Sequence, residues 1–206
     1  NLSPFINESR KSFRKRLIEC GMNENDEHFN TILENMVIKD VEDGVQTFVY
    51  QLNTMSGTNG QSPFITLFMY LDDVPNGQEK DDLALLIQKI LEQRIVGFKN
   101  KQGVYIAPAF PKLIYVLDED NITEDSKYWY LTKLAAECTA KRMVPDYVSA
   151  KVMKELKDGN VYTPMGCRSF LTPAYVDKND PWKITTKKKG IPKFEGRFNQ
   201  GVVTIN

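Results

Sequence analysis

The sequence predicts an α/β protein with a largely parallel sheet. Strand-like apolar runs at 64–71 and 107–117 alternate with helical patterns at 77–96 and 125–142. Strands separated by helices usually lie parallel, because the chain must cross over to return to the same edge of the sheet. The run at 64–71 is apolar at almost every position, which favours a strand buried on both faces.

The composition is that of an ordinary globular protein. The 206 residues are 41% hydrophobic and include 11 Phe, 9 Tyr and 2 Trp, which excludes a disordered, collagen-like or disulfide-scaffold chain. The 27 basic and 27 acidic residues cancel. A net charge of zero argues against a protein that holds nucleic acid on a large basic surface, so we expect no nucleic-acid partner, although local basic clusters remain possible.

We expect a cytoplasmic protein without a membrane partner. The longest mostly apolar stretch, 63–71, is far shorter than the roughly 20 residues that span a bilayer, and the first residues lack the basic and apolar regions of a signal peptide. Three cysteines are too few and too scattered for a disulfide framework or a zinc site, so we expect no metal ligands.

The elements of the first half follow from hydrophobic spacing. An amphipathic helix is predicted at 8–19, ending at Cys20 and the glycine after it, and a second at about 26–37. A third, at 41–53, follows acidic residues that suit a helix N-terminus. The glycines, amides and hydroxyls of 54–63 then predict a loop before the first strand.

The second half is less regular. The helix at 77–96 has leucines and isoleucines on one face, and a last helix is predicted at 147–156. From 158 to 198 there is little periodicity, and a basic run occupies 187–189. We interpret this part as a short hairpin insertion and a functional loop.

Cys167 is the candidate catalytic residue. Pro164 and Gly166 predict a tight turn that can hold its sulfur at a loop tip, and Arg168 could lower the thiol pKa or orient an anionic substrate. A cysteine is also commonly a small buried hydrophobic residue, and both interpretations stay open from the pattern alone. The only histidine, His28, could act as a base only if the fold brings it to the thiol.

Five ordered strings carry a family resemblance. They are LNTMSGTNGQSPF at 52–64, FPKLI at 110–114, LAAECTAKRMVPD at 134–146, PMGCRSFL at 164–171 and GRFNQGVVTIN at 196–206. Together they resemble anaerobic (class III) ribonucleoside-triphosphate reductase. The resemblance covers most of the chain, from about residue 40 to the end.

The resemblance implies part of a ten-stranded α/β barrel of the glycyl-radical enzyme and ribonucleotide reductase type, with a finger loop through its centre. Residues 1–206 would be a fragment of one catalytic domain. A helical entry segment would occupy 1–40, alternating helices and strands 41–157, and the finger loop, hairpin insertion and following strand 158–206. The fragment alone is expected to be inactive.

The resemblance also implies roles for individual residues. Cys167 would form a transient thiyl radical that removes the 3′ hydrogen of the ribonucleotide. Asn199 would lie beside the ribose hydroxyls, where an amide can donate and accept hydrogen bonds; otherwise it is a turn residue before a strand. Arg168 and Ser169 are expected to contact substrate. The loop residues expected to contact nucleotide are Asn59, Gln61 and Ser62, although polar loop residues are often merely solvated.

The implied cofactor is a glycyl radical on a residue outside this sequence, with no metal within it. The implied partners are ribonucleoside triphosphates, deoxynucleoside triphosphate and ATP effectors, a radical-SAM iron–sulfur activating enzyme, and a second copy in a homodimer. The departures from the family pattern begin with a longer segment at 172–195. The sequence also lacks a glycyl-radical motif, a C-terminal zinc-type cysteine quartet, an N-terminal ATP-regulatory domain and a second active-site cysteine upstream of the first match.

Two alternatives to a reductase remain. One is a glycyl-radical lyase of the pyruvate formate-lyase type, against which the motif around Asn199 and the polar loop argue. The other is a non-catalytic nucleotide-binding or dimerisation module. Cys138 falls on the apolar side of the 125–142 helix and is expected to be a packing residue, and Cys20 is also expected to be structural.

Overall fold

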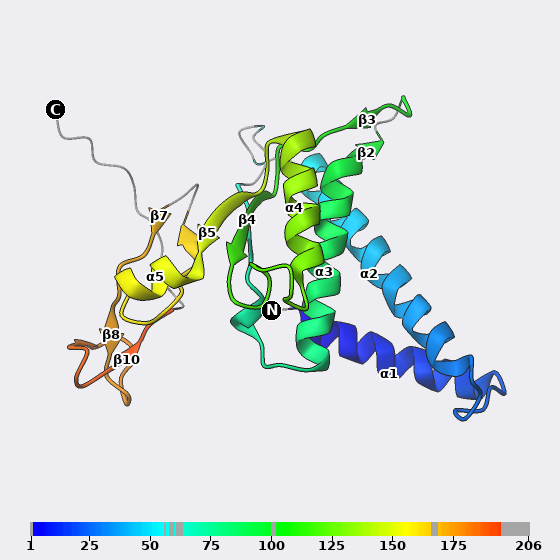
Figure 1. Ribbon diagram of the computed structural model, residues 1–206, viewed down its shortest axis with the longest axis horizontal. Helices are drawn as coiled ribbons and strands as arrows, with labels where there is room; N and C mark the ends of the chain where they lie inside the picture. Colours follow the sequence, from blue (N-terminus) through cyan, green and yellow to red (C-terminus); the bar gives the residue numbers. More distant parts are fainter. Residues whose placement is uncertain are drawn as a thin grey trace.

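The chain folds around a parallel β-sheet (Figure 1). In this computed structural model the described residues are 2–55, 57, 60, 64–99, 102–165 and 169–194. The strand order is β1-β4-β5, formed by Thr66–Met69, Lys112–Leu117 and Asp146–Ser149. Both pairings are parallel. The predicted α/β class with a parallel sheet is therefore confirmed.

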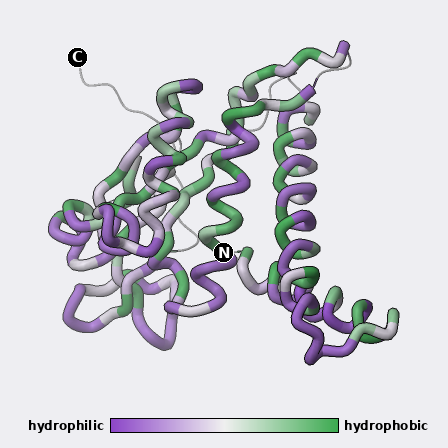
Figure 2. The backbone as a smooth tube through the Cα atoms, turned by 45° about the vertical axis from the view of Figure 1, so that its right-hand side comes forward, coloured by the Kyte–Doolittle hydropathy of each residue, from purple (hydrophilic) through white to green (hydrophobic). Residues whose placement is uncertain are grey.

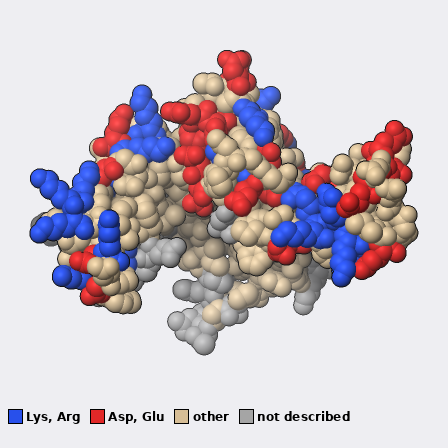
Figure 3. Space-filling model, turned by 90° about the horizontal axis from the view of Figure 1, so that it is seen from below, with Lys and Arg blue, Asp and Glu red and all other residues tan. Residues whose placement is uncertain are grey.

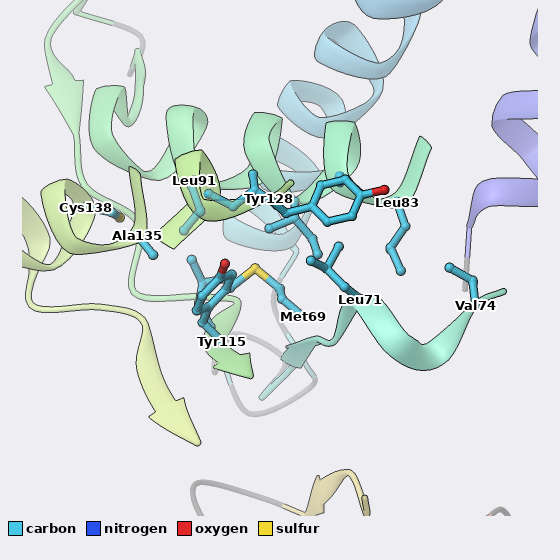
Figure 4. Close-up of a cluster of buried hydrophobic side chains, with 13 residues drawn as sticks. Met69, Leu71, Val74, Leu83, Leu91, Tyr115, Tyr128, Ala135 and Cys138 are labelled. Carbon is cyan, nitrogen blue, oxygen red and sulfur yellow. The ribbon is translucent and has the colours of Figure 1, made fainter. Parts of the chain in front are cut away.

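Helices α3 (Gln78–Val96) and α4 (Trp129–Arg142) pack on the sheet and on each other. Figure 4 shows the resulting core, in which Leu91, Tyr115 and Cys138 are completely buried. A buried leucine stabilises a fold by about 1.5–3 kcal/mol relative to an exposed one. The apolar faces predicted for both helices therefore point into this core.

Helices α1 (Ser3–Glu19) and α2 (Phe29–Thr54) form a hairpin beside α3 (Figure 1). The prediction of separate helices at 26–37 and 41–53 is wrong, because α2 is continuous. Its buried side chains recur every three or four residues through the predicted break, and Lys39 pairs with Asp43 across one turn, at 2.6 Å. Hydrophobic and hydrophilic residues accordingly both recur in successive turns along α2 (Figure 2).

One predicted strand and one predicted helix need correction. Strand β4 begins at Lys112, not at 107, and β5 occupies the first residues of the helix predicted at 147–156. The helix α5 (Ala150–Leu156) begins only after Ser149, whose hydroxyl accepts a hydrogen bond from the backbone N–H of Val152. Residues 146–149 form a strand because they pair with β4. The local spacing of hydrophobic residues does not show that such a partner strand exists.

Strand β1 lies at the edge of this sheet among the described residues, and three of its four side chains are only half-buried. The expectation of burial on both faces is therefore not met within residues 1–206. The short elements that connect the larger ones are η1 (Leu71–Asp73), β2 (Phe98–Lys99) and β3 (Tyr105–Ile106).

The last third contains two small antiparallel sheets. Strands β6 (Pro164–Met165) and β7 (Ser169–Phe170) form a hairpin. Strands β8 (Tyr175–Val176), β9 (Ile184–Thr185) and β10 (Ile191–Pro192) form a three-stranded sheet in the order β10-β8-β9. The segment predicted to hold a hairpin thus forms an antiparallel sheet with a third strand, and its being an insertion relative to the family stays a prediction.

Candidate functional site

Most of the sequence-predicted site residues lie outside the described part of the chain. This holds for Asn59, Gln61, Ser62, Cys167, Arg168 and Asn199. Ser169 begins β7, and only its backbone is described. The roles of these seven residues therefore remain predictions, and the structure describes the elements that flank them.

Cys167 lies in sequence between the paired strands β6 and β7. In this hairpin Pro164 pairs with Phe170, and Met165 pairs with Ser169. The paired residues therefore stand directly before and after 166–168 in the sequence. Strand β6 lies against β1 of the parallel sheet. The strand that leads into the cysteine motif therefore lies beside β1, and the strand that follows the motif pairs with it.

The chain before this hairpin is firmly anchored. The Tyr162 side chain is 1% exposed, and its ring centroid lies 5.0 Å from that of Phe194. The backbone N–H of Tyr162 also donates to the Sδ of Met153 in α5, at 3.1 Å. This packing ties the residues before the hairpin to α5 and to the residue pair that follows β10.

The ends of the polar loop at 54–63 are held at the amino edge of the parallel sheet. The Asn53 amide donates to the carbonyl oxygens of Val49, at 2.7 Å, and Phe110, at 3.1 Å. The rings of Phe64 and Phe110 pack edge to face with centroids 5.2 Å apart. The end of α2, the start of β1 and the segment before β4 therefore meet at one place.

Arg94 supports the same edge and was missed by the sequence analysis. Its guanidinium is buried, and it donates to the carbonyl oxygens of Pro108 and Pro111, just before β4. Burial lowers its pKa. Arg94 follows Leu91 by three residues on the buried face of α3, and a cation on an apolar stripe is the signal that could have identified it.

A second polar cluster lies at the carboxyl edge of the sheet, where ligands commonly bind in α/β proteins. Lys80, at the start of α3, is 2% exposed, and its Nζ lies 2.6 Å from an Asp120 oxygen and 3.4 Å from an Asp72 oxygen. Lys154 of α5 also lies 3.7 Å from Asp72. This cluster was missed by the sequence analysis. Its sequence signal is a set of carboxylates within three residues of the ends of β1 and β4.

Asp118 is the most perturbed carboxyl group of this cluster. It is 8% exposed, and its Oδ1 accepts a hydrogen bond from the Asp120 backbone N–H. Its Oδ2 has no hydrogen-bond partner among the described residues. Burial, together with the charges of Asp120 and Asp72, raises the pKa of Asp118 to about 6, although the same backbone hydrogen bond and Lys80 lower it.

The other two cysteines and the histidine have no catalytic arrangement among the described residues. Cys138 is completely buried, as predicted, and burial raises the pKa of its thiol. Cys20 is exposed at the C-terminal end of α1. Its exposure gives no support to the predicted structural role. The exposed imidazole of His28 lies 3.2 Å from its neighbour Glu27.

Neither a metal cluster nor a membrane span occurs in the described part of the chain. No group of three or more His, Cys, Asp or Glu residues there is placed to hold a metal ion. No described helix is both long and apolar enough to cross a membrane. An apolar cavity of about 480 Å³ lies between α1, α2, β1 and α3, and no described residue of β6 or β7 lines it.

The amino-acid sequence is similar to that of proteins of one known family. A parallel sheet packed against helices, with the β6–β7 hairpin beside β1, defines the class of this protein as α/β. Residues 1–206 match the family model described as anaerobic ribonucleoside-triphosphate reductase. The chain belongs to that family.

Individual relatives carry the same name. The anaerobic ribonucleoside-triphosphate reductase of Enterobacteria phage T4 is 40% identical over 171 residues, which is 82% of this chain and 25% of the phage protein. The Haemophilus influenzae and Escherichia coli enzymes are 31% and 30% identical over the whole chain, and it covers 26% and 25% of their lengths. The chain thus spans about a quarter of these relatives.

Proposed function

We propose that this chain is part of the catalytic barrel of an enzyme that reduces ribonucleoside triphosphates to 2′-deoxyribonucleoside triphosphates for DNA synthesis. The observation that carries the proposal is the match of the whole chain to the reductase family. The parallel sheet with its packed cysteine hairpin supports it. A ten-stranded barrel with a finger loop, of which residues 1–206 form a part, is the architecture we propose for the full-length protein.

Cys167 is the proposed hydrogen-atom carrier. An S–H bond is weak enough to exchange with a carbon-centred radical, and the thiyl radical can still take hydrogen reversibly from a ribose carbon. Cys138 is sealed in the core and Cys20 lies at the end of an outer helix, so neither thiol suits this role. A glycyl radical elsewhere in the full-length protein would supply the unpaired electron, after installation by an iron–sulfur activating enzyme.

The proposed substrate contacts come from three segments. Asn199 hydrogen-bonds the ribose hydroxyls, and Arg168 and Ser169 contact the substrate beside the thiol. Asn59, Gln61 and Ser62 contact nucleotide from the polar loop. The described residues at the two ends of that loop are held by the Asn53 hydrogen bond and by the Phe64–Phe110 ring pair. Deoxynucleotide and ATP effectors and a homodimer complete the proposed enzyme.

The test is reduction by the full-length protein, activated anaerobically with its activating enzyme. We expect Cys167→Ser to abolish deoxynucleotide formation, because a serine O–H bond is too strong for the exchange. Cys20→Ser is the matched control and should keep wild-type activity, since Cys20 is exposed. Deoxynucleotide formation by Cys167→Ser would remove this thiol from the mechanism. An inactive wild-type protein in the same assay would contradict the proposed function itself.

A further inference from the structure

The segment at 172–194 has a surface that the proposed reaction does not use. It contains six lysines and two aspartates, a net charge of +4, so the remaining residues carry −4. The overall charge of zero therefore conceals two oppositely charged parts. Figure 3 shows basic side chains gathered at the end of the molecule that carries β8 and β10.

The acidic residues of this segment do not neutralise its lysines. Asp177 accepts a hydrogen bond from the backbone N–H of Asn179, and Asp180 accepts one from the backbone N–H of Trp182. Lys187 pairs with Asp158, outside the segment, at 2.7 Å. Among the described residues, no carboxylate lies within ion-pair distance of Lys178, Lys183, Lys188 or Lys189.

Two large apolar side chains lie beside these lysines. Trp182 is 84% exposed and Ile184 is 81% exposed. The ammonium of Lys193 lies 4.8 Å from the centroid of the Trp182 ring and donates to the Pro181 carbonyl oxygen. An exposed indole beside lysines that have no carboxylate partner among the described residues combines a planar stacking surface with positive charge, which is how proteins bind single-stranded nucleic acid.

The surface is preformed. Strand β8 pairs with both β9 and β10, and the backbone N–H of Asp177 donates to Lys183 across the turn that carries Trp182. Gly190 sits so close to the neighbouring strands that a Cβ there would lie 2.3 Å from the Thr185 methyl and 2.6 Å from the Val176 carbonyl oxygen. Little ordering of the backbone is therefore required on binding.

The choice of cation indicates the kind of partner. All six basic residues of the segment are lysines, and none is arginine. The arginine fork matches both carboxylate and phosphate, so it does not distinguish the two kinds of partner. Protein–protein interfaces are, however, depleted in lysine relative to the rest of the protein surface. Lysine is a compact point charge that suits the phosphates of a flexible strand.

We propose that the surface at 172–194 binds single-stranded nucleic acid, with a base stacked on Trp182 and phosphates on Lys188 and Lys189. This differs from the absence of a nucleic-acid partner that the overall charge suggested, because the charge is unevenly distributed. The inference does not depend on the reductase reaction.

The test measures the affinity of the full-length protein for a fluorescently labelled oligothymidylate as a function of salt. We expect Trp182→Ala to weaken binding about tenfold through the lost stacking. The double variant Lys188→Ala/Lys189→Ala should lower the slope of log affinity against log salt by about 1.4, or roughly 0.7 for each phosphate contact. The control is Lys15→Ala/Lys39→Ala, which removes the same charge from exposed positions on α1 and α2.

Four outcomes would overturn the proposal. The wild-type protein fails to bind the oligothymidylate at low salt, or the Trp182 variant binds as tightly as the control. Polyglutamate displaces the oligothymidylate as well as unlabelled oligothymidylate does, which would indicate an acidic protein partner. Excess nucleoside triphosphate displaces it, which would assign the binding to the nucleotide site. Thermal unfolding confirms that each variant is folded, and the high exposure of Trp182 makes this the expected result.

Discussion

At the scale of single residues, the structure separates polar groups that support the fold from those that strain it. Arg94 is buried but its guanidinium donates to two carbonyl oxygens, which offsets its desolvation. Asp118 is equally buried and one of its oxygens has no partner among the described residues. Its raised pKa means that the folded state binds a proton more tightly than the unfolded state does.

Asp118→Asn should therefore stabilise the protein above pH 6. The native pKa is about 6, above the ordinary value of 3.8, so the stability that Asp118 contributes is present below pH 4 and is lost as pH rises through 6. We expect a gain of about 1–3 kcal/mol at pH 7.5 and a smaller gain at pH 5. Urea unfolding at both pH values measures it, with Asp125→Asn as an exposed control. An equal effect of Asp118→Asn at the two pH values would contradict a raised pKa.

At the scale of elements, charged contacts fix how α1 is placed. Arg10 of α1 donates to Glu34 of α2, at 2.9 Å, and to both carboxylate oxygens of Asp82 in α3. The Asp82 side chain is only 3% exposed. Ile6 supplies the apolar part of the same junction. One arginine therefore joins the three helices that surround the apolar cavity.

Arg10→Ala should destabilise the protein strongly, because it leaves Asp82 as a buried charge without its main partner. We expect a loss of about 3 kcal/mol, together with faster amide hydrogen exchange in α1. The exposed pair of Lys11 with Glu8 provides the control, since Lys11→Ala should cost no more than about 0.5 kcal/mol. A similar loss for both variants would show that the Arg10 contacts add nothing beyond a surface ion pair.

Two glycines should respond in opposite directions to the same substitution. Gly190→Ala should destabilise the β8–β10 sheet by about 1–3 kcal/mol, because the added Cβ meets Thr185 and the Val176 backbone. Gly44 lies inside α2, and a Cβ added there would meet no atom within 4 Å. Gly44→Ala should stabilise the protein by up to about 1 kcal/mol through helix propensity. Denaturation curves of both variants test the prediction, and a gain for Gly190→Ala would refute the tight packing of that sheet.

At the scale of the whole molecule, one core joins the sheet to α3 and α4. It includes side chains from β1, β4, α3 and α4 (Figure 4). The segment at 172–194 lies outside this core and carries its own small sheet. The core and this segment should therefore lose structure independently when one of them is damaged.

Leu91→Ala tests how far one buried side chain holds this core together. Leu91 is completely buried between α3, α4 and the sheet, so its truncation should cost about 2–5 kcal/mol and raise hydrogen exchange throughout the core. The matched control is Leu156→Ala, because Leu156 is 74% exposed and should tolerate the change. Core exchange that stays at the wild-type rate in Leu91→Ala would show that this leucine does not hold the helices to the sheet.

The sequence by itself determined the α/β class, the helices α3 and α4 and the packing role of Cys138, because hydrophobic periodicity reports which face of a helix is buried. It placed the start of α4 at 125, whereas the helix begins at Trp129. It also contained the motifs that place the chain in its family. The predicted roles of Cys167 and Asn199 rest on that resemblance.

Only the tertiary structure decided the rest. The strand at 146–149 exists because it pairs with β4, and α2 is continuous because its buried stripe packs without interruption against α1 and α3. The clusters around Lys80 and Arg94 join residues far apart in the chain. Such contacts depend on which elements become neighbours, and local spacing carries no information about that choice.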